Sequence, residues 1–352
     1  MRLDSRRIPV VVLIAVLASA VAVGQAPSSA KSTVLGTGAF TSFVENMDRS
    51  LAFYHDAFGM EVPALPATGE RPYNPANSQL FDMFDIAGAK ERHQSARITG
   101  TRVTLELMEI QNVPHQTINL RMQDPGNATL VLMVRDVDAA LARATQAKAT
   151  VETPGGKPVN FADGTRAILI RDIDRRFIEL RQPASVLTAG TAQVADIFDM
   201  ALLLTVNEME ETKRVYRDVL GFTVEDKPVS NMIRSLTGIQ TSQQILQSRV
   251  QAPGSMLWIE LIEFKGVDRT PLRMKIQDRG AARLQLRVQD VDVTVAAMKA
   301  AGFKVNSVGG VAVPIPPNLK GALVADPNYF FLTPYATCPG CAPTVVPPAP
   351  AR

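Results

Sequence analysis

The sequence predicts an α+β fold of four βαβββ units, arranged as two tandem modules. Three segments occur twice in the same order, and such an internal repeat indicates a repeated structural unit. The matched segments are 43–60 with 205–222, 101–110 with 255–264, and 121–138 with 275–292. A chain of 352 residues has the length of two or three domains, and the repeat selects two. We therefore predict module 1 at residues 36–183 and module 2 at residues 195–335.

Each module begins with an extended apolar segment and continues into a helix. The extended segments are 35–44 and 199–206. In the first helix Met47 and Tyr54 belong to an apolar stripe at helical spacing, which Tyr216 continues in module 2. Strands then follow in both modules, so the repeated unit reads as strand, helix and further strands.

Capping residues mark the predicted helix boundaries. Asn46 is a natural N-cap for the first helix, and Gly59 stands where a left-handed C-cap is needed. In the second half of each module, a helix starts at Asp136 or at Asp290. Paired aspartates can suggest a metal site, but an aspartate at a helix start is far more often a cap that the helix dipole favours.

Module 1 contains an insertion relative to module 2. The separation from Tyr54 to Glu106 is 52 residues, whereas that from Tyr216 to Glu260 is 44. The extra length falls within residues 63–100. We predict a loop and a short helix there, covering the mouth of a pocket.

Composition and charge exclude a nucleic-acid-binding protein. The chain is 46% hydrophobic and 20% charged, as in ordinary folded proteins. Its net charge is +3, of which Arg2, Asp4, Arg6 and Arg7 supply +2, so the remainder carries about +1. No basic cluster is interleaved with aromatic residues, as a nucleic-acid surface would require.

The first 24 residues predict an export signal. Arg2, Arg6 and Arg7 precede an apolar run over residues 8–24, and small residues come just before Gln25. We therefore expect a periplasmic or secreted protein. The alternative is an uncleaved N-terminal anchor, which would be the protein's single contact with a membrane.

The C-terminal residues 336–352 are rich in proline and predict a disordered tail. The tail contains Cys338 and Cys341, the two cysteines of the chain. A zinc site would need two more ligands nearby, and the sequence offers none. A local disulfide or two idle thiols are the remaining interpretations.

The ordered motifs resemble the vicinal oxygen chelate superfamily, which includes the glyoxalase I, fosfomycin and bleomycin resistance, and extradiol dioxygenase families. The resemblance rests on residues 50–60, 104–109, 178–183, 214–222, 259–264 and 325–329, and on the two Asp-Val-Asp helix starts. It extends from about residue 36 to 335. It implies two tandem glyoxalase/bleomycin-resistance/dioxygenase-like modules, each with a cup. This fold hosts several chemistries as well as plain binding proteins.

The resemblance further implies a divalent metal in a cup, held by side chains from four strands. The corresponding positions are Ala39, Glu106, Thr129 and Glu179 in module 1, and Ala201, Glu260, Arg283 and Thr333 in module 2. None of them is histidine. The three histidines, His55, His93 and His115, fall outside the predicted ligand strands. A metal site based on histidine is therefore not expected.

Module 1 retains two glutamates that the alignment directs into one cup. Glu106 and Glu179 would repel each other unless a cation, a shared proton or an arginine balanced them. Arg181 follows Glu179 by two residues, so it lies on the same strand face and can neutralise it. A divalent ion bound by Glu106 and Glu179 is the alternative.

Module 2 is expected to have replaced the metal with an arginine. Arg283 occupies a ligand position that we expect to lie opposite Glu260, and a guanidinium can satisfy a carboxylate without metal. Trp258 precedes Glu260 by two residues and should share its face. The indole is either a stacking surface for a ligand or ordinary core.

These observations predict an exported glyoxalase-like protein that binds a small molecule in the module 1 cup. The pocket candidates are Glu106, Thr129, Glu179, Trp258, Glu260 and Arg283. The alternative is a metal-dependent lyase or dioxygenase of the glyoxalase or extradiol type, using Glu106 and Glu179. A structural protein is a third possibility, against which the lid-like insertion argues. Enzymatic activity, catalytic residues and oligomeric state stay open at this point.

Overall fold

The structure, a computed structural model, describes residues 33–74, 78–99, 101, 104–186, 197–228, 231–241, 244–315 and 317–339. The predicted signal at residues 1–24 lies outside the described residues, as does Cys341. The last strand extends to Thr337, two residues into the predicted tail. Among the described residues, no helix has the length and apolar character needed to cross a membrane.

Module 1 contains the first two units. The first comprises β1 (Val34–Phe43), α1 (Met47–Phe58), α2 (Ser78–Phe84), β2 (Lys90–Arg97) and β3 (Thr104–Gln111). The second comprises β4 (Ala128–Val134), α3 (Val137–Gln146), β5 (Thr150–Val151), β6 (Val159–Asn160), β7 (Arg166–Arg171), β8 (Phe177–Gln182) and a 3₁₀ turn at Ala184–Val186.

Module 2 repeats this order. The third unit comprises β9 (Ile197–Thr205), α4 (Met209–Asp218), β10 (Thr223–Asp226), α5 (Met232–Thr237), β11 (Ile245–Gln251) and β12 (Trp258–Phe264). The fourth comprises β13 (Ala282–Val288), α6 (Val291–Ala300), β14 (Lys304–Val305), a 3₁₀ turn at Val308–Gly310, β15 (Val313–Ile315), β16 (Leu319–Gly321), β17 (Val324–Ala325) and β18 (Phe331–Thr337).

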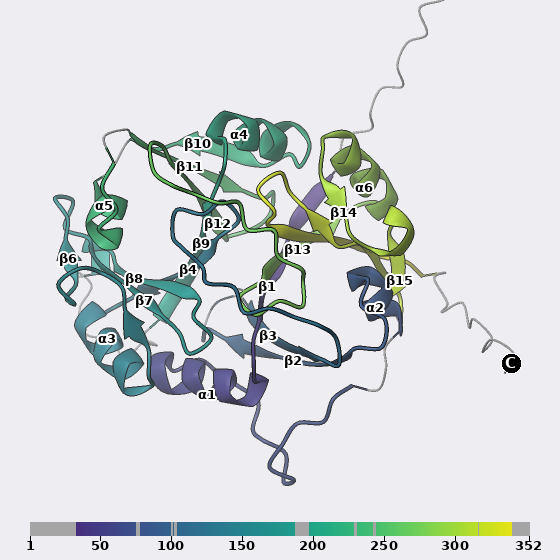
Figure 1. Ribbon diagram of the computed structural model, residues 1–352, viewed down its shortest axis with the longest axis horizontal. Helices are drawn as coiled ribbons and strands as arrows, with labels where there is room; N and C mark the ends of the chain where they lie inside the picture. The colour runs from purple at the N-terminus through teal and green to yellow at the C-terminus, as the bar shows by residue number, and fades with distance from the viewer. Residues whose placement is uncertain are drawn as a thin grey trace, which may run out of the picture. The chain divides into compact units, whose positions relative to one another are not determined.

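Each of the two sheets combines strands from both modules. Sheet 1 has the order β14-β17-β18-β13-β1-β3-β2, with β15 and β16 attached beside β18, so it joins the first unit to the fourth. Sheet 2 has the order β10-β11-β12-β9-β4-β8-β7-β5, with β6 beside β7, so it joins the second unit to the third. The antiparallel pairs β1–β13 and β4–β9 make these joins (Figure 1).

The expectation of one cup in each module is therefore wrong. Each unit presents its first strand as an edge, and an edge strand offers unpaired backbone groups to a partner. Because the four units are similar, their edges can pair in more than one combination. Residues 112–127 connect β3 to β4 and carry the chain from sheet 1 to sheet 2. The sequence repeat predicts the units but does not determine which edges meet.

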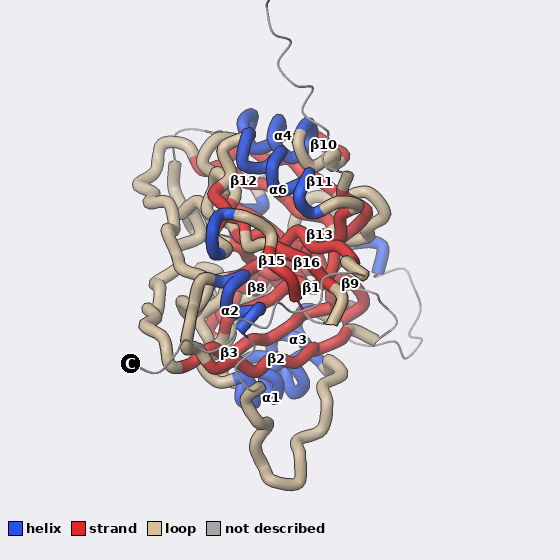
Figure 2. The backbone as a smooth tube through the Cα atoms, turned by 90° about the vertical axis from the view of Figure 1, so that its right-hand side faces the viewer, coloured by secondary structure: helices blue, strands red, loops and turns tan. Residues whose placement is uncertain are grey.

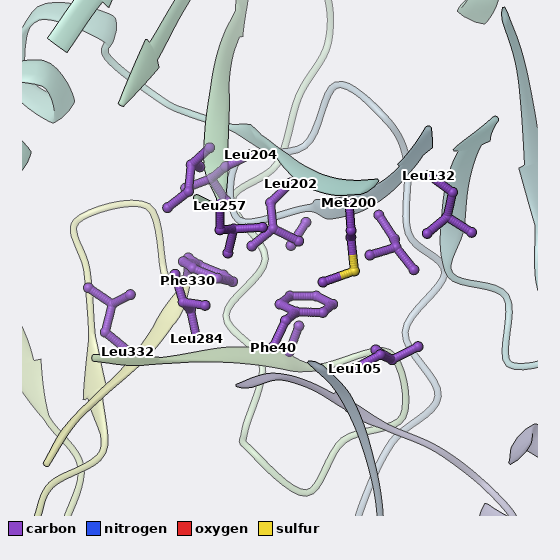
Figure 3. Close-up of a cluster of buried hydrophobic side chains, with 14 of the residues drawn as sticks. Phe40, Leu105, Leu132, Met200, Leu202, Leu204, Leu257, Leu284, Phe330 and Leu332 are labelled. Atoms are coloured by element: carbon purple, nitrogen blue, oxygen red, sulfur yellow. The ribbon is translucent and has the colours of Figure 1, made fainter. Parts of the chain in front are cut away.

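A shared hydrophobic core lies between the two sheets. Phe40 and Leu284 extend into it from sheet 1, and Met200, Leu202 and Leu204 extend into it from sheet 2 (Figure 3). All five side chains are buried. Helices α1 and α3 contact each other on one side of the strands, and α4 and α6 lie on the other side (Figure 2). Since strand residues alternate between faces, the residues beside these core positions point away from the core.

The predicted capping residues are confirmed. The Asn46 side chain accepts a hydrogen bond from the Arg49 amide at 2.9 Å, and Gly59 has a φ of 66° at the end of α1. Asp136 accepts amide hydrogen bonds from Asp138 and Ala139, and Asp290 accepts one from Val293. The first aspartate of each Asp-Val-Asp segment is thus the N-cap of a helix.

The segment that holds the extra length of module 1 contains a helix and an edge strand. The short helix predicted within residues 63–100 is α2, whose Leu80 and Met83 are buried against sheet 1. The same segment also forms β2, which pairs with β3 at the edge of that sheet. Module 2 has the equivalent helix α5 and strand β11, so the extra residues of module 1 lie in the connection between α1 and α2.

Candidate ligand-binding site

Three polar side chains meet on the face of sheet 1 that points away from the shared core. We call this face, with the segments that cover it, cup 1. Thr41 on β1 is the register neighbour of both Glu106 on β3 and Arg283 on β13. Glu106 Oε2 accepts hydrogen bonds from Thr41 Oγ1 at 2.6 Å and from Arg283 Nη2 at 3.1 Å. Arg283 Nε donates to Thr41 Oγ1 at 3.2 Å, which closes the triangle.

Glu106 and Arg283 form a charge-balanced pair. Burial on its own would raise the pKa of Glu106, but the Arg283 guanidinium, the nearby His93 and the hydrogen bonds from Thr41 and Arg283 together bring it below its ordinary value. Burial lowers the pKa of Arg283, and Glu106 counteracts that change. An arginine remains protonated despite such a shift, so the pair is carboxylate and guanidinium.

His93 adds a second pair to cup 1. It lies on β2 opposite Met108, and its Nδ1 is 2.8 Å from Glu91 Oε2. The hydrogen bond with Glu91 raises the pKa of His93, while burial opposes the increase. Glu91 is buried and also accepts a hydrogen bond from Asn74 Nδ2 at 2.6 Å. A protonated His93 therefore faces a carboxylate that balances its charge.

A cavity of about 430 Å³ lies over these groups. Its polar side consists of sheet residues, namely His93, Glu106, Arg283, Gln285, Thr333 and Tyr335. Its apolar side comes mainly from Leu80 and Met83 of α2 and from Ile315 and Leu319 of the β15–β16 hairpin. Glu106 Oε1 has no hydrogen-bond partner among the described residues, so it is available to a donor in the cavity.

The equivalent face of sheet 2, which we call cup 2, is closed by an arginine. Arg181 on β8 donates from Nε to Glu179 Oε1 at 2.6 Å. Its Nη1 and Nη2 donate to the two oxygens of Glu260 on β12, at 2.6 and 2.9 Å. The expectation that Arg181 neutralises Glu179 is confirmed. Arg181 also crosses β4 and β9 to reach the second glutamate.

The two glutamates of cup 2 respond oppositely to the shared guanidinium. Burial raises the pKa of Glu179, and Arg181 offsets only part of that increase. Burial also acts to raise the pKa of Glu260, but Arg181 outweighs it and the pKa lies below its ordinary value. Glu179 Oε2 is buried without a hydrogen-bond partner among the described residues, which explains why this carboxylate is the harder one to ionise.

Apolar side chains cover the centre of cup 2, and a cavity of about 170 Å³ remains beside Leu169 and Phe177. Val131, Leu203 and Ile262 belong to a buried cluster on this face. Trp258 packs against that cluster, and the Arg249 guanidinium lies 3.9 Å from the centre of its ring. Trp258 is therefore partly buried, with one side against the apolar cluster and one ring face occupied by a cation.

Two expected side-chain groupings are wrong. Glu106 and Glu179 do not share a cup, because Glu106 lies on sheet 1 and Glu179 lies on sheet 2. Arg283 does not oppose Glu260; it pairs with Glu106, and Arg181 pairs with Glu260. Both errors have the same cause, which is that each sheet combines units of different modules.

The six predicted pocket residues are divided between the cups. Glu106 and Arg283 lie in cup 1, and Glu179, Glu260, Trp258 and Thr129 lie in cup 2. Thr129 is buried and accepts a hydrogen bond from Asn127 Nδ2 at 3.2 Å.

The structure adds residues to cup 1 that the sequence analysis missed. Gln285 and Tyr335 follow the predicted positions Arg283 and Thr333 by two residues, so the two-residue period of a strand could have identified them. His93 could not have been found in this way, because its placement depends on the register of β2 against β3.

The residues present do not fit the divalent metal that the resemblance implies. In cup 1 the Arg283 guanidinium occupies the neighbourhood of Glu106, where further ligands would be needed. In cup 2 the Arg181 guanidinium binds both carboxylates. Across the part of the chain that the structure describes, no three His, Cys, Asp or Glu side chains come together as a metal site would require. We therefore derive no chemistry through a metal.

Comparison with known proteins agrees with this fold. The Glyoxalase/Bleomycin resistance protein/Dioxygenase superfamily model matches residues 36–180 and again residues 197–310, and the chain belongs to that superfamily. A mutant of glyoxalase I from Zea mays is similar at a TM-score of 0.54 and 14% identity, over 88% of this chain and 93% of that chain. A putative dioxygenase from Bacillus subtilis is similar at a TM-score of 0.52 and 12% identity, over 88% and 87%. At these identities the likeness shows the fold alone. A search of curated proteins finds no match.

Proposed function

We propose that the protein binds a small organic molecule in the cavity of cup 1. The observation that carries this proposal is the 430 Å³ cavity, which has a polar side on sheet 1 and an apolar side on α2 and the β15–β16 hairpin. Cavities of this size with an apolar lining and a few convergent polar groups are typical of small-molecule sites. Glu106, Arg283 and Gln285 would orient the ligand, and Leu80 and Met83 would contact its apolar part.

The low pKa of Glu106 favours a binding role for this residue over general-base catalysis. A general base works best when its pKa lies near the operating pH. The pKa of Glu106 lies below its ordinary value, because Arg283 and His93 favour the ionised form, so Glu106 is a weak base. It is nevertheless a good hydrogen-bond acceptor, since an ionised carboxylate forms strong hydrogen bonds with donors.

We further propose that binding takes place outside the cytoplasm. The support is the basic and apolar N-terminal sequence over residues 1–24, which has the composition of an export signal. N-terminal sequencing of the protein recovered from the periplasm or medium of an expressing bacterium tests this. A mature N-terminus near Gln25 is expected, and a cytoplasmic protein that begins at Met1 would contradict the proposal.

A thermal-shift screen of small aromatic and oxygenated compounds tests the binding proposal. A compound present at 100 times its Kd should stabilise the fold by about 2.7 kcal/mol, which is a measurable rise in Tm. The variant Met83→Trp fills the cavity and should abolish the rise. Trp258→Phe changes cup 2 and should leave it intact.

The screen has two contrary outcomes. If no compound raises the Tm, the proposal of a small-molecule site fails. If the rise survives in a folded Met83→Trp variant and disappears in Trp258→Phe, the ligand binds in cup 2 and the wrong cup has been assigned.

A further inference from the structure

A second cavity adjoins the first at Tyr335, where β1 begins. It has a volume of about 280 Å³ and lies between the start of β1, the turn at residues 254–257, and the side chains of Arg287 and Tyr335. Tyr335 lines both cavities. Arg287 is the register neighbour of Tyr335 and follows Gln285 by two residues on β13, so it belongs to the same face. One ligand could therefore occupy both cavities.

The charge of Arg287 is not balanced by a neighbour. Arg283 faces Glu106, and His93 faces Glu91, whereas Arg287 has no carboxylate partner among the described residues. Its one recorded hydrogen bond is a long one, from Nη2 to the Leu35 carbonyl at 3.4 Å. Arg287 thus places an uncompensated positive charge at the wall of the second cavity.

Two hydroxyl groups beside Arg287 leave a hydrogen-bond donor available. Thr37 Oγ1 and Ser255 Oγ are 2.6 Å apart, and Ser255 Oγ accepts the Leu257 amide hydrogen bond at 3.0 Å. One hydroxyl hydrogen is used between the two oxygens, which leaves the other for a third group. Both residues line the second cavity, so the free hydroxyl hydrogen is a further donor in the cavity that Arg287 borders.

Glycine at position 38 permits this arrangement. A Cβ at Gly38 would lie 2.7 Å from Gln285 Oε1 and 3.2 Å from the Tyr335 hydroxyl. The missing side chain therefore lets Gln285 and Tyr335 approach β1 between the two cavities. The Tyr335 hydroxyl has no hydrogen-bond partner in the described part of the chain. It is available to a ligand that passes from one cavity to the other.

We propose that the ligand of cup 1 is an elongated organic anion whose acidic group binds Arg287 and whose apolar body fills the 430 Å³ cavity. This inference rests on the proposed function, since it names the class of molecule that the same site would take. Carboxylate and guanidinium match in charge and geometry, and the hydroxyl of Thr37 or Ser255 would supply a further hydrogen bond. Arg283, whose charge Glu106 balances, and His93 would contact the apolar body of the ligand at the polar wall of the larger cavity.

Binding of matched acids and amides tests the inference. The probes are phenylalkanoates from benzoate to 6-phenylhexanoate, each with its primary amide, measured by isothermal titration calorimetry. At least one of the longer acids should bind about tenfold or more tightly than its amide, because only the acid gains a charge-assisted contact. Arg287→Gln should remove that preference, and Arg287→Lys should retain part of it. The preference should also decrease at high salt, since Arg287 is exposed.

The outcomes separate this inference from the function on which it rests. One outcome would contradict the anionic ligand but support the small-molecule site. In that outcome acids and amides bind equally, Arg287→Gln has no effect, and Met83→Trp abolishes the binding of both. If no acid or amide of the series binds, the inference is overturned, and the broader thermal-shift screen decides the small-molecule site separately. The Tm of each unliganded Arg287 variant should match that of the wild type, because Arg287 makes no ion pair that its loss would break.

Discussion

Cup 1 and cup 2 are built from equivalent strands, but the cup-facing side chains of one central strand are polar in cup 1 and mostly apolar in cup 2. On β13, cup 1 has three long polar side chains where the repeat places smaller or apolar ones on β4. The pairs are Arg283 with Thr129, Gln285 with Val131, and Arg287 with Met133. The polar set lines two cavities, whereas Val131 lies within a buried apolar cluster. Cup 1 therefore offers contacts to a ligand that cup 2 does not.

The last strand of each module, β8 or β18, reverses this difference. Cup 2 has Glu179 and Arg181 on β8, where cup 1 has Thr333 and Tyr335 on β18. In both cups a guanidinium forms an ion pair with the glutamate of β3 or β12. Placed on β8, the guanidinium of Arg181 reaches across the sheet and closes the cup. Placed on β13, that of Arg283 lies beside its glutamate and leaves the space above open.

The largest expected effect is the loss of the cation in cup 2. Arg181→Ala would leave the buried Glu179 without a counter-charge and would leave Glu260 with only the weaker influence of Arg249 and Lys227. We expect the free energy of unfolding to fall by about 3–5 kcal/mol, as when one partner of a buried ion pair is removed. Urea denaturation measures this.

Acid should partly rescue this variant. Without Arg181 the pKa of each buried carboxyl should rise, so its contribution to stability is present at low pH and lost as the pH rises through the folded pKa. A variant as stable as the wild type at pH 7 would show that the guanidinium does not hold cup 2 closed.

Loss of the cation in cup 1 should cost less. Arg283→Ala leaves one carboxylate, Glu106, which still accepts a hydrogen bond from Thr41 and borders a cavity that water can enter. We expect a decrease of about 1–3 kcal/mol, the usual cost of an unsatisfied buried polar group. Arg287→Ala is a matched control on the same strand and face, and it should change stability by about 0.5 kcal/mol or less. Equal losses in Arg283→Ala and Arg181→Ala would remove the distinction between an open and a closed cup.

Arg181 and Arg283 also show how far the sequence could predict the site. The repeat predicts four units, their helix caps and the strand positions of Glu106, Glu260 and Arg283, because these follow from local periodicity. The partners of those residues depend on which edge strands pair. That choice is made between segments more than 100 residues apart, as for Thr41 and Arg283. Nothing local distinguishes one edge from its repeat. The sequence therefore predicted the pair Arg181 and Glu179, which share a strand, but not the partners that come from another unit.

The pH dependence of the two glutamates in cup 2 should differ in sign. The pKa of Glu260 is lower in the folded state than its ordinary 4.5, so its ionised form stabilises the fold above that value and the stabilisation is lost as the pH falls. The pKa of Glu179 is raised, so its contribution is greatest at acid pH and is lost as the pH rises through the folded value. The stability advantage of wild type over Glu260→Gln should therefore grow with pH, and its advantage over Glu179→Gln should shrink.

Urea denaturation between pH 4 and 8 measures both differences. We expect the two differences to change with pH in opposite directions. Slopes of the same sign for the two variants would mean that Arg181 serves both carboxylates equally, contrary to the buried and unpaired Oε2 of Glu179.

The smallest expected effect is on the fluorescence of Trp258. This residue is the one tryptophan of the chain, and it lies in cup 2 with Arg249 over its ring. A ligand that binds in cup 1 should raise the Tm while leaving the emission maximum and the acrylamide quenching of Trp258 unchanged, because the shared core separates the two faces. Trp258 is thus an internal reporter for the cup that we expect to stay closed. A compound that shifts its emission in proportion to the rise in Tm would have to open the Arg181 pairs, and the two cups would then both be binding sites.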